Sequence, residues 1–157
     1  MFGKLDNKEL ESLLNRQVIG RIGCHDNGVT YVVPISYAYD GEYIYAHTFN
    51  GMKIEFMRKN REVCFQVDDT RNLSNWQSVI TWGEYEEITD EPGKKNALRL
   101  LNNRVVPIPS SETMHLTPDW PFSPNKMEQV EGIFFRLRLT KKTGRFEKTS
   151  GEFFYGT

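Results

Sequence analysis

The stretch 32-VVPISYAYDGEYIYAHTFNGMK-53 joins two strand-like runs, a tight turn and the beginning of a helix. Residues 30–39 and 42–47 are rich in β-branched and aromatic side chains, and the Asp-Gly pair between them is a strong hairpin signal. Residues 53–60 then carry apolar side chains at helical spacing. The stretch therefore predicts a β-hairpin whose second strand leads into a short helix.

Polar groups gather where this predicted strand meets the predicted helix. His47 and Thr48 end the strand, Gly51 permits unusual backbone conformations, and Lys53 begins the helix. A helix N-terminus presents unpaired N–H groups and a partial positive charge, to which a lysine adds a full charge. The pattern is typical of a phosphate-binding site, although similar junctions occur in proteins that bind nothing there.

The rest of the chain is predicted to be mainly β, with helices at the periphery (an α+β arrangement). Asp6 and Glu9 form a capping-box pattern before one helix, and Asp90 begins another that runs to about Asn103. Many short strands with few helices indicate a β-barrel or sandwich and not a doubly wound parallel sheet. No G-x-G-x-x-G or P-loop pattern is present, which excludes nucleotide sites built on those signatures. The strand-like segments are residues 18–25, 30–39, 42–47, 62–68, 77–88 and 132–141.

Length and composition predict one domain that covers residues 1–157. The chain has 38% hydrophobic and 13% aromatic residues, enough for a real core at this length. Proline-rich residues 105–127 are expected to form a long loop, which is either functional or poorly ordered. Residues 144–157 are expected to be a short additional strand or a loose tail. His115 has no motif around it and receives no role.

The composition also excludes several classes of function. Because 20 Lys and Arg are offset by 21 Asp and Glu, the net charge of -1 provides no global field for nucleic acid or an anionic membrane. Without a signal-peptide core or a membrane-length apolar run, we expect a cytoplasmic protein that does not enter a membrane. Cys24 and Cys64 lack C-x-x-C spacing, and a turn signal follows Cys24 closely, so neither a disulfide nor a metal site is expected.

A succession of short motifs runs through roughly residues 18–101. The motifs are Ile19-Gly20-Arg21-Ile22-Gly23, Tyr31-Val32-Val33-Pro34-Ile35-Ser36-Tyr37, Tyr45-Ala46-His47-Thr48, Gly51-Met52-Lys53, Val63-Cys64-Phe65-Gln66-Val67-Asp68 and Trp76-Gln77-Ser78-Val79-Ile80 with Gly83. In this order they resemble the pyridoxamine 5'-phosphate oxidase-like flavoproteins, and within them the nitroimidazole-resistance group. Each motif is weak alone, and their common order makes the resemblance specific.

The resemblance implies a split β-barrel that forms a homodimer, with FMN in the cleft between the subunits. Thr48 and Lys53 would hold the FMN phosphate, with Met52 contributing through its backbone, and His47 would lie near the ring or the ribityl chain. The remaining implied cofactor contacts are Val33, Pro34, Ile35 and Ser36, which would line the isoalloxazine ring, and Trp76, Gln77 and Ser78, from a subunit that the sequence does not identify.

Taken without the family, some of these residues have plainer interpretations. Pro34 and Ser36 are also typical of an edge strand or a bulge, and Trp76 of a buried packing residue. His47 alone would be a hydrogen-bonded histidine at a strand end. The cofactor assignments of these residues therefore depend on the resemblance.

The leading functional hypothesis is an FMN-dependent oxidoreductase that passes electrons from a reduced donor to a small aromatic or nitro-containing acceptor, with His47 as a proton donor. True pyridoxamine 5'-phosphate oxidases carry a C-terminal arginine-containing segment that residues 144–157 do not reproduce, which argues against that activity. One alternative is a carrier or sensor that binds FMN or haem without turnover, with His47 as an axial haem ligand. Another is an interaction module that uses the barrel as a scaffold.

Overall fold

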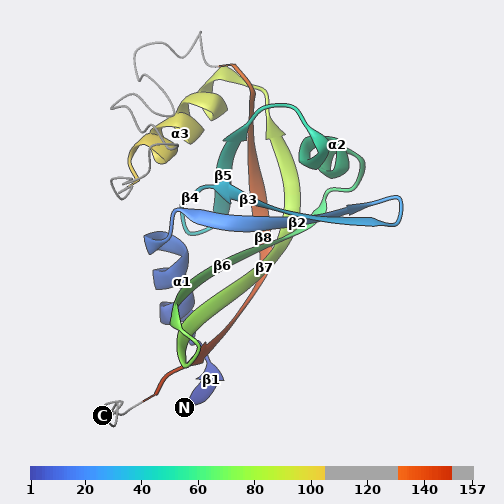
Figure 1. The fold of residues 1–157 in the computed structure, drawn as a ribbon. Helices are drawn as coiled ribbons and strands as arrows, with labels where there is room; N and C mark the ends of the chain where they lie inside the picture. Colours follow the sequence, from blue (N-terminus) through green and yellow to red (C-terminus); the bar gives the residue numbers. More distant parts are fainter. Residues whose placement is uncertain (105–130, 150–157) are drawn as a thin grey trace, which may run out of the picture.

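The computed structural model describes residues 1–104 and 131–149, and within them eight strands and three helices (Figure 1). The predicted loop at residues 105–127 and the end of the chain from residue 150 lie outside the described residues. The elements are β1 Phe2–Lys4, α1 Asn7–Arg16, β2 Ile19–Asp26, β3 Val29–Ser36, β4 Ala38–Tyr39, β5 Tyr43–Thr48, α2 Met52–Lys59, β6 Glu62–Asn72, β7 Asn75–Ile88, α3 Glu91–Asn102 and β8 Ile133–Glu147.

Two helices begin as their sequences predict. The Asp6 side chain accepts a hydrogen bond from the backbone N–H of Glu9, and the Glu9 side chain accepts one from the N–H of Asp6, both at 2.9 Å. This reciprocal capping box begins α1. At α3, the Asp90 side chain accepts from the N–H of Gly93 at 2.9 Å. α2 has no side-chain cap at its N-terminus, which leaves the first N–H groups of that helix available.

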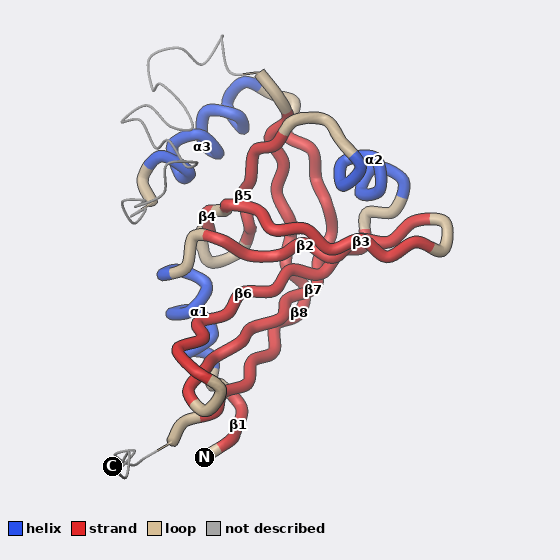
Figure 2. Tube along the Cα trace, in the orientation of Figure 1, coloured by secondary structure: helices blue, strands red, loops and turns tan. Residues whose placement is uncertain are grey.

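The strands form one antiparallel sheet in the order β3-β2-β6-β7-β8-β5-β4, with β1 added on β8. The two end strands, β3 and β4, are separated in the chain by Tyr37 alone, whose N–H donates to the carbonyl of Val18. Because consecutive residues connect its two ends, the sheet curls round on itself, and Figure 2 shows the helices outside the curved strands. The prediction of a mainly β fold with peripheral helices is confirmed.

Strands β7 and β8 pair over almost their whole length. Pairing steps from Lys141 to Leu139 between Trp82 and Gly83, which makes Thr140 the extra residue of a β-bulge. β8 also continues beyond its predicted end, because β7 lies on one side of its last residues and β1 on the other. The expectation of an additional strand or loose tail from residue 144 is therefore wrong for residues 144–147, which belong to β8.

Two groups of buried side chains fill the interior. The larger one packs α1 and α2 on the sheet, with Leu14, Ile54 and Phe65 almost completely enclosed. The second lies beneath α3, where Leu101 packs with Phe134. Among the described residues, no helix has the length and apolar character needed to cross a membrane.

Candidate functional site

The N-terminus of α2 presents backbone donors in open space. The first hydrogen bonds inside the helix run from the N–H groups of Ile54 and Glu55 to the carbonyl of Gly51, each at 3.1 Å. The N–H groups of Met52 and Lys53 precede those bonds and have no acceptor within the described chain. A Cβ added at Gly51 would meet nothing within 4 Å. A ligand with oxygen acceptors can therefore approach this backbone closely.

Lys53 and Thr48 add side-chain groups to the same junction. Lys53 is half-buried and forms no ion pair with a described residue. Burial raises the pKa of the Cys24 thiol, Cys64 raises it further, and the charge of Lys53 opposes them. Thr48 ends β5, and its hydroxyl donates to the carbonyl of Phe49 at 3.3 Å. The Thr48 hydroxyl, two backbone N–H groups and Lys53 therefore belong to one strand-to-helix junction, and their role in binding phosphate stays a prediction.

His47 lies one residue earlier, on β5, in an aromatic setting. Its ring centroid is 4.7 Å from that of Phe134 and 5.8 Å from that of Phe49. Its Nε2 is 2.6 Å from the carbonyl oxygen of Glu131, so Nε2 carries a proton and donates it. Burial lowers the pKa of His47 from 6.5, with the contact to Glu131 opposing this shift, so the neutral imidazole is favoured at pH 7. Haem ligation through Nε2 would require the contact with Glu131 to break.

The predicted ring-lining strand, β3, shows two different faces. Ile35 is buried in the core, whereas Pro34 is exposed and Ser36 half-exposed on the outer face. Val33 is half-buried. β3 pairs with β2 along one edge, and no described strand pairs with its other edge over these residues. The outer side chains and the open backbone edge are the parts of β3 that a ligand can contact, while Ile35 can offer only its backbone.

Trp76, Gln77 and Ser78 lie far from this junction in the same chain. Trp76 pairs with Glu147 at the end of β8, whereas His47 pairs with Phe134 near its beginning. Thirteen residues separate these two positions of β8, which corresponds to about 40 Å along an extended strand. Figure 1 shows the β6–β7 turn beside β1, at the opposite end of the sheet from α2. One chain alone therefore does not bring the two halves of the predicted site together.

The three distant residues have contacts of their own. Trp76 Nε1 donates to the Glu147 carboxylate at 3.1 Å, and Gln77 Oε1 accepts from Arg16 at 2.8 Å. Ser78 Oγ accepts from the Gln66 side chain at 3.1 Å. Trp76 and Gln77 also line a cavity of about 360 Å³. These residues are accessible from the surface and are not enclosed in the core.

Arg104 lies beside the end of β3, and the sequence did not indicate it as a site residue. It follows α3, and its guanidinium donates through Nη1 to Ser36 Oγ and to the carbonyl of Tyr37, the latter at 2.9 Å. Its Nε donates to the carbonyl of Leu101 at 2.8 Å. Burial lowers the pKa of Arg104. The contact places a cation at the Ser36 end of β3, and no local pattern marks it because 68 residues separate the two.

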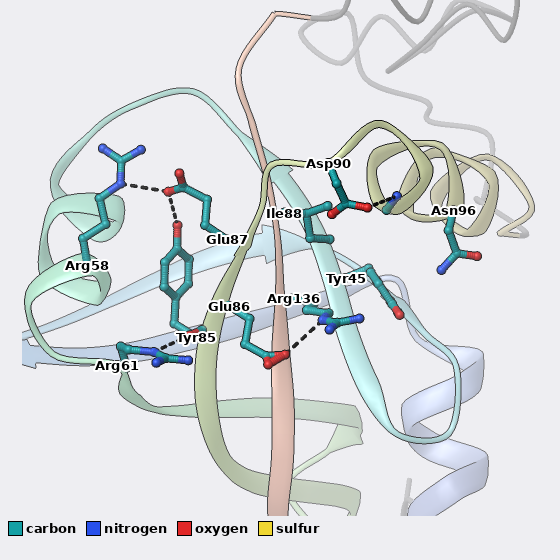
Figure 3. Close-up of a pocket in the computed structure, with 11 residues that line it drawn as sticks. Tyr45, Arg58, Arg61, Tyr85, Glu86, Glu87, Ile88, Asp90, Asn96 and Arg136 are labelled. Atoms are coloured by element: carbon teal, nitrogen blue, oxygen red, sulfur yellow. Dashed lines mark hydrogen bonds and ion pairs between the residues drawn. The ribbon is translucent and has the colours of Figure 1, made fainter.

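A larger cavity, of about 610 Å³, lies between α2 and α3 across β7 (Figure 3). Two of its arginines pair with carboxylates: Arg58 Nε lies 2.8 Å from the Glu87 carboxylate, and Arg136 Nε lies 3.0 Å from that of Glu86. The hydroxyl of Tyr85 also donates to Glu87, at 2.7 Å. None of the predicted site residues lines this cavity. It is thus separate from the predicted cofactor site.

Comparison with known proteins places the fold. The family model described as pyridoxamine 5'-phosphate oxidase matches residues 6–146. The chain belongs to this family. An uncharacterized protein of Rhizobium meliloti (strain 1021), RA0666, is 26% identical over 153 residues, which cover 90% of this chain and 92% of the relative. The family resemblance predicted from the motifs is confirmed.

Solved structures of the family share the architecture. An FAD-binding protein from Mesorhizobium loti is 28% identical, with a TM-score of 0.70 over 94% of this chain and 99% of the other. A candidate 5-nitroimidazole antibiotic resistance protein from Bacteroides thetaiotaomicron is 21% identical, with a TM-score of 0.70 over 93% of this chain and 87% of the other. The curled antiparallel sheet is therefore the split β-barrel expected from the sequence.

Proposed function

We propose that the protein is an FMN-dependent oxidoreductase of the nitroimidazole-resistance type. It would act as a homodimer with FMN between the subunits and pass electrons from a reduced donor to a small aromatic or nitro-containing acceptor. The observation that carries the proposal is the uncapped N-terminus of α2, which Gly51 leaves open and which lies between Thr48 and Lys53 in the chain. The similarity to the Mesorhizobium loti protein, which binds FAD, supports a flavin as the ligand.

The residues present fit a flavin phosphate. A phosphate needs several donors and positive charge, which the N–H groups of Met52 and Lys53, the Lys53 ammonium and the Thr48 hydroxyl supply. No carboxylate forms an ion pair with Lys53 among the described residues, so its charge is available to a ligand. The flavin, once bound, supplies the electron-transfer chemistry. The protein's part is to hold the phosphate and to present β3 to the ring.

β3 and His47 have different roles in this proposal. The open edge of β3 offers backbone donors and acceptors for the pyrimidine edge of a flavin, and Pro34 and Ser36 offer an outer surface for the ring. His47 donates its Nε2 proton to the Glu131 carbonyl, so it could protonate an acceptor only after releasing that contact. In the described geometry, the contact with Glu131 therefore holds the imidazole of His47 at the end of β5.

In the proposed homodimer, Trp76, Gln77 and Ser78 would contribute to the site of the other subunit. This assignment accounts for the distance of about 40 Å along β8 between the pairing positions of His47 and Trp76. An apolar outer surface supports a partner on this face: the exposed fractions are 46% for Ile19, 64% for Val32 and 47% for Met52. A second copy of the chain would cover these side chains.

The test is a visible absorption spectrum of the purified protein, with the released chromophore identified, its ratio to protein measured and the native mass determined. FMN near one per chain in a dimer, oxidation of NADH or NADPH by the protein, and reduction of a nitroaromatic acceptor would support the proposal. A haem band would support the carrier hypothesis instead. A colourless protein that rejects added FMN would refute the cofactor assignments.

A further inference from the structure

Arg104 is a half-buried cation whose hydrogen bonds to described residues all run to neutral oxygens. Its acceptors are the hydroxyl of Ser36 and the carbonyls of Tyr37 and Leu101. Within residues 1–104 and 131–149, no carboxylate forms an ion pair with it. Arg16 and Arg58, by contrast, each pair with a carboxylate. A guanidinium removed from water without a counter-ion is costly, so this position favours a negatively charged partner.

Two donors at this corner have no acceptor among the described residues. Arg104 Nη2 has no hydrogen bond with any described residue, and Ser36 Oγ accepts from Arg104, which leaves the Ser36 proton for another acceptor. The C-terminal end of α3 contributes a partial negative charge of only about half a unit, which offsets part of the cation. Nη2 of Arg104 and the neighbouring Ser36 hydroxyl together match a group with two oxygens, above all a carboxylate, which can accept from both.

The location of this corner connects it to the proposed reaction. Ser36 lies on the outer face of β3, at the end nearest α3, and β3 is the strand proposed to face the flavin ring. We propose that Arg104 and Ser36 bind the carboxylate of the acceptor, so that the substrates are small aromatic acids. That the bound acid is the electron acceptor rests on the proposed function, whereas the carboxylate site itself rests on the contacts of Arg104 alone.

Two isosteric ligands test the charge requirement. Benzoate and nitrobenzene both carry a planar pair of oxygens on a phenyl ring, but only benzoate is an anion. Binding of each to the purified protein is measured by isothermal titration calorimetry, together with the melting temperature. We expect wild-type protein to bind benzoate on the order of tenfold more tightly than nitrobenzene, because hydrogen bonds to a charged group are the stronger ones.

Four variants identify the residues responsible. We expect Arg104→Gln to weaken benzoate binding about 10- to 100-fold, because it removes charge-assisted hydrogen bonds. Arg104→Lys keeps the positive charge but not the planar guanidinium, so it should retain part of the affinity for benzoate. Ser36→Ala should lose less of this affinity than Arg104→Gln. Arg61→Gln is the matched control. Arg61 also donates through Nε to a carbonyl, that of Tyr85, but it lines the separate cavity of about 610 Å³. This variant should bind benzoate as wild type does.

The outcomes separate a binding role from a helix cap. Equal benzoate affinity in wild type and Arg104→Gln, with only a lower melting temperature in the variant, would overturn the proposal and leave Arg104 as a cap on α3. If Arg104→Gln does not fold, Arg104→Lys and Ser36→Ala decide the question in the same assay. Benzoate binding through Arg104 in a protein that takes up no flavin would refute the proposed function alone. A flavoprotein that binds benzoate no better than nitrobenzene would refute this inference alone.

Discussion

The imidazole Nε2 of His47 lies 2.6 Å from the backbone carbonyl oxygen of Glu131, and only the imidazole can supply the proton in this contact. Burial lowers the pKa of His47 from 6.5. Because the unfolded chain then binds a proton more readily than the folded one, the free energy of unfolding falls as the pH drops below about 6.5. Protonation of His47 thus contributes to acid destabilisation.

Replacement of His47 by glutamine, which keeps an N–H donor, should remove this contribution. We expect His47→Gln to show a smaller loss of unfolding free energy between about pH 7 and pH 5 than wild type, in urea denaturation at fixed salt. His25→Gln, on the exposed β2–β3 hairpin, is the control and should follow wild type. An identical pH dependence in wild type and His47→Gln would show that His47 does not contribute.

A second prediction concerns the bulge in β8. A Cβ at Gly83 would lie 2.3 Å from the carbonyl oxygen of Arg138, a backbone atom that cannot move aside alone. Gly83→Ala should therefore lower the free energy of unfolding by about 1 to 3 kcal/mol, as overpacking does. Gly51→Ala is the matched control, because a Cβ there meets nothing within 4 Å. Equal melting temperatures for the two variants would contradict the close approach of β7 to β8.

Local signals predicted much of the fold. The capping box of Asp6 and Glu9 and the Asp90 cap depend on side chains three residues from the groups they bind, so a short sequence window contains them. The run of β-branched and aromatic residues around the Asp-Gly turn predicted strands on both sides of it. The single strand predicted over residues 30–39 is wrong, because the chain divides at Tyr37 into β3, which pairs with β2, and β4, which pairs with β5. The end of β8 was missed because charged residues occupy both of its faces near Lys141, which obscures the alternation.

The parts of the site that depend on topology could not be predicted. The contact of Arg104 with Ser36 joins a residue that follows α3 to a residue on β3, and no periodicity connects the two. The order of motifs along the chain likewise contains no distances, so it could show neither that the pairing positions of Trp76 and His47 lie at opposite ends of β8 nor which subunit supplies Trp76. Only Thr48 and Lys53 lie within one short stretch of chain, so a local pattern could place them at one strand-to-helix junction, and their role in binding phosphate stays a prediction.

That junction yields a prediction that isolates the phosphate. Lys53→Gln should weaken FMN binding about 10- to 100-fold, because a charge-assisted contact to phosphate is lost. Riboflavin, which lacks the phosphate, should bind wild type and variant equally. Fluorescence titration of the apoprotein measures both affinities. Lys59→Gln, in the last turn of the same helix, is the control. Equal losses for FMN and riboflavin would place Lys53 away from the phosphate.

The separation of the two halves of the site predicts complementation between defective subunits. In a heterodimer of Lys53→Gln and Trp76→Ala chains, a site built from both subunits would have either no substitution or both. Purified heterodimer, isolated with two different tags, should therefore bind FMN tightly at one of its two sites, while each variant homodimer binds it weakly at both. If Trp76 acted within its own chain, every site in the heterodimer would carry one substitution and no tight site would appear. Since Trp76 and His47 pair at positions about 40 Å apart along β8, the first pattern is the one that the strand geometry favours.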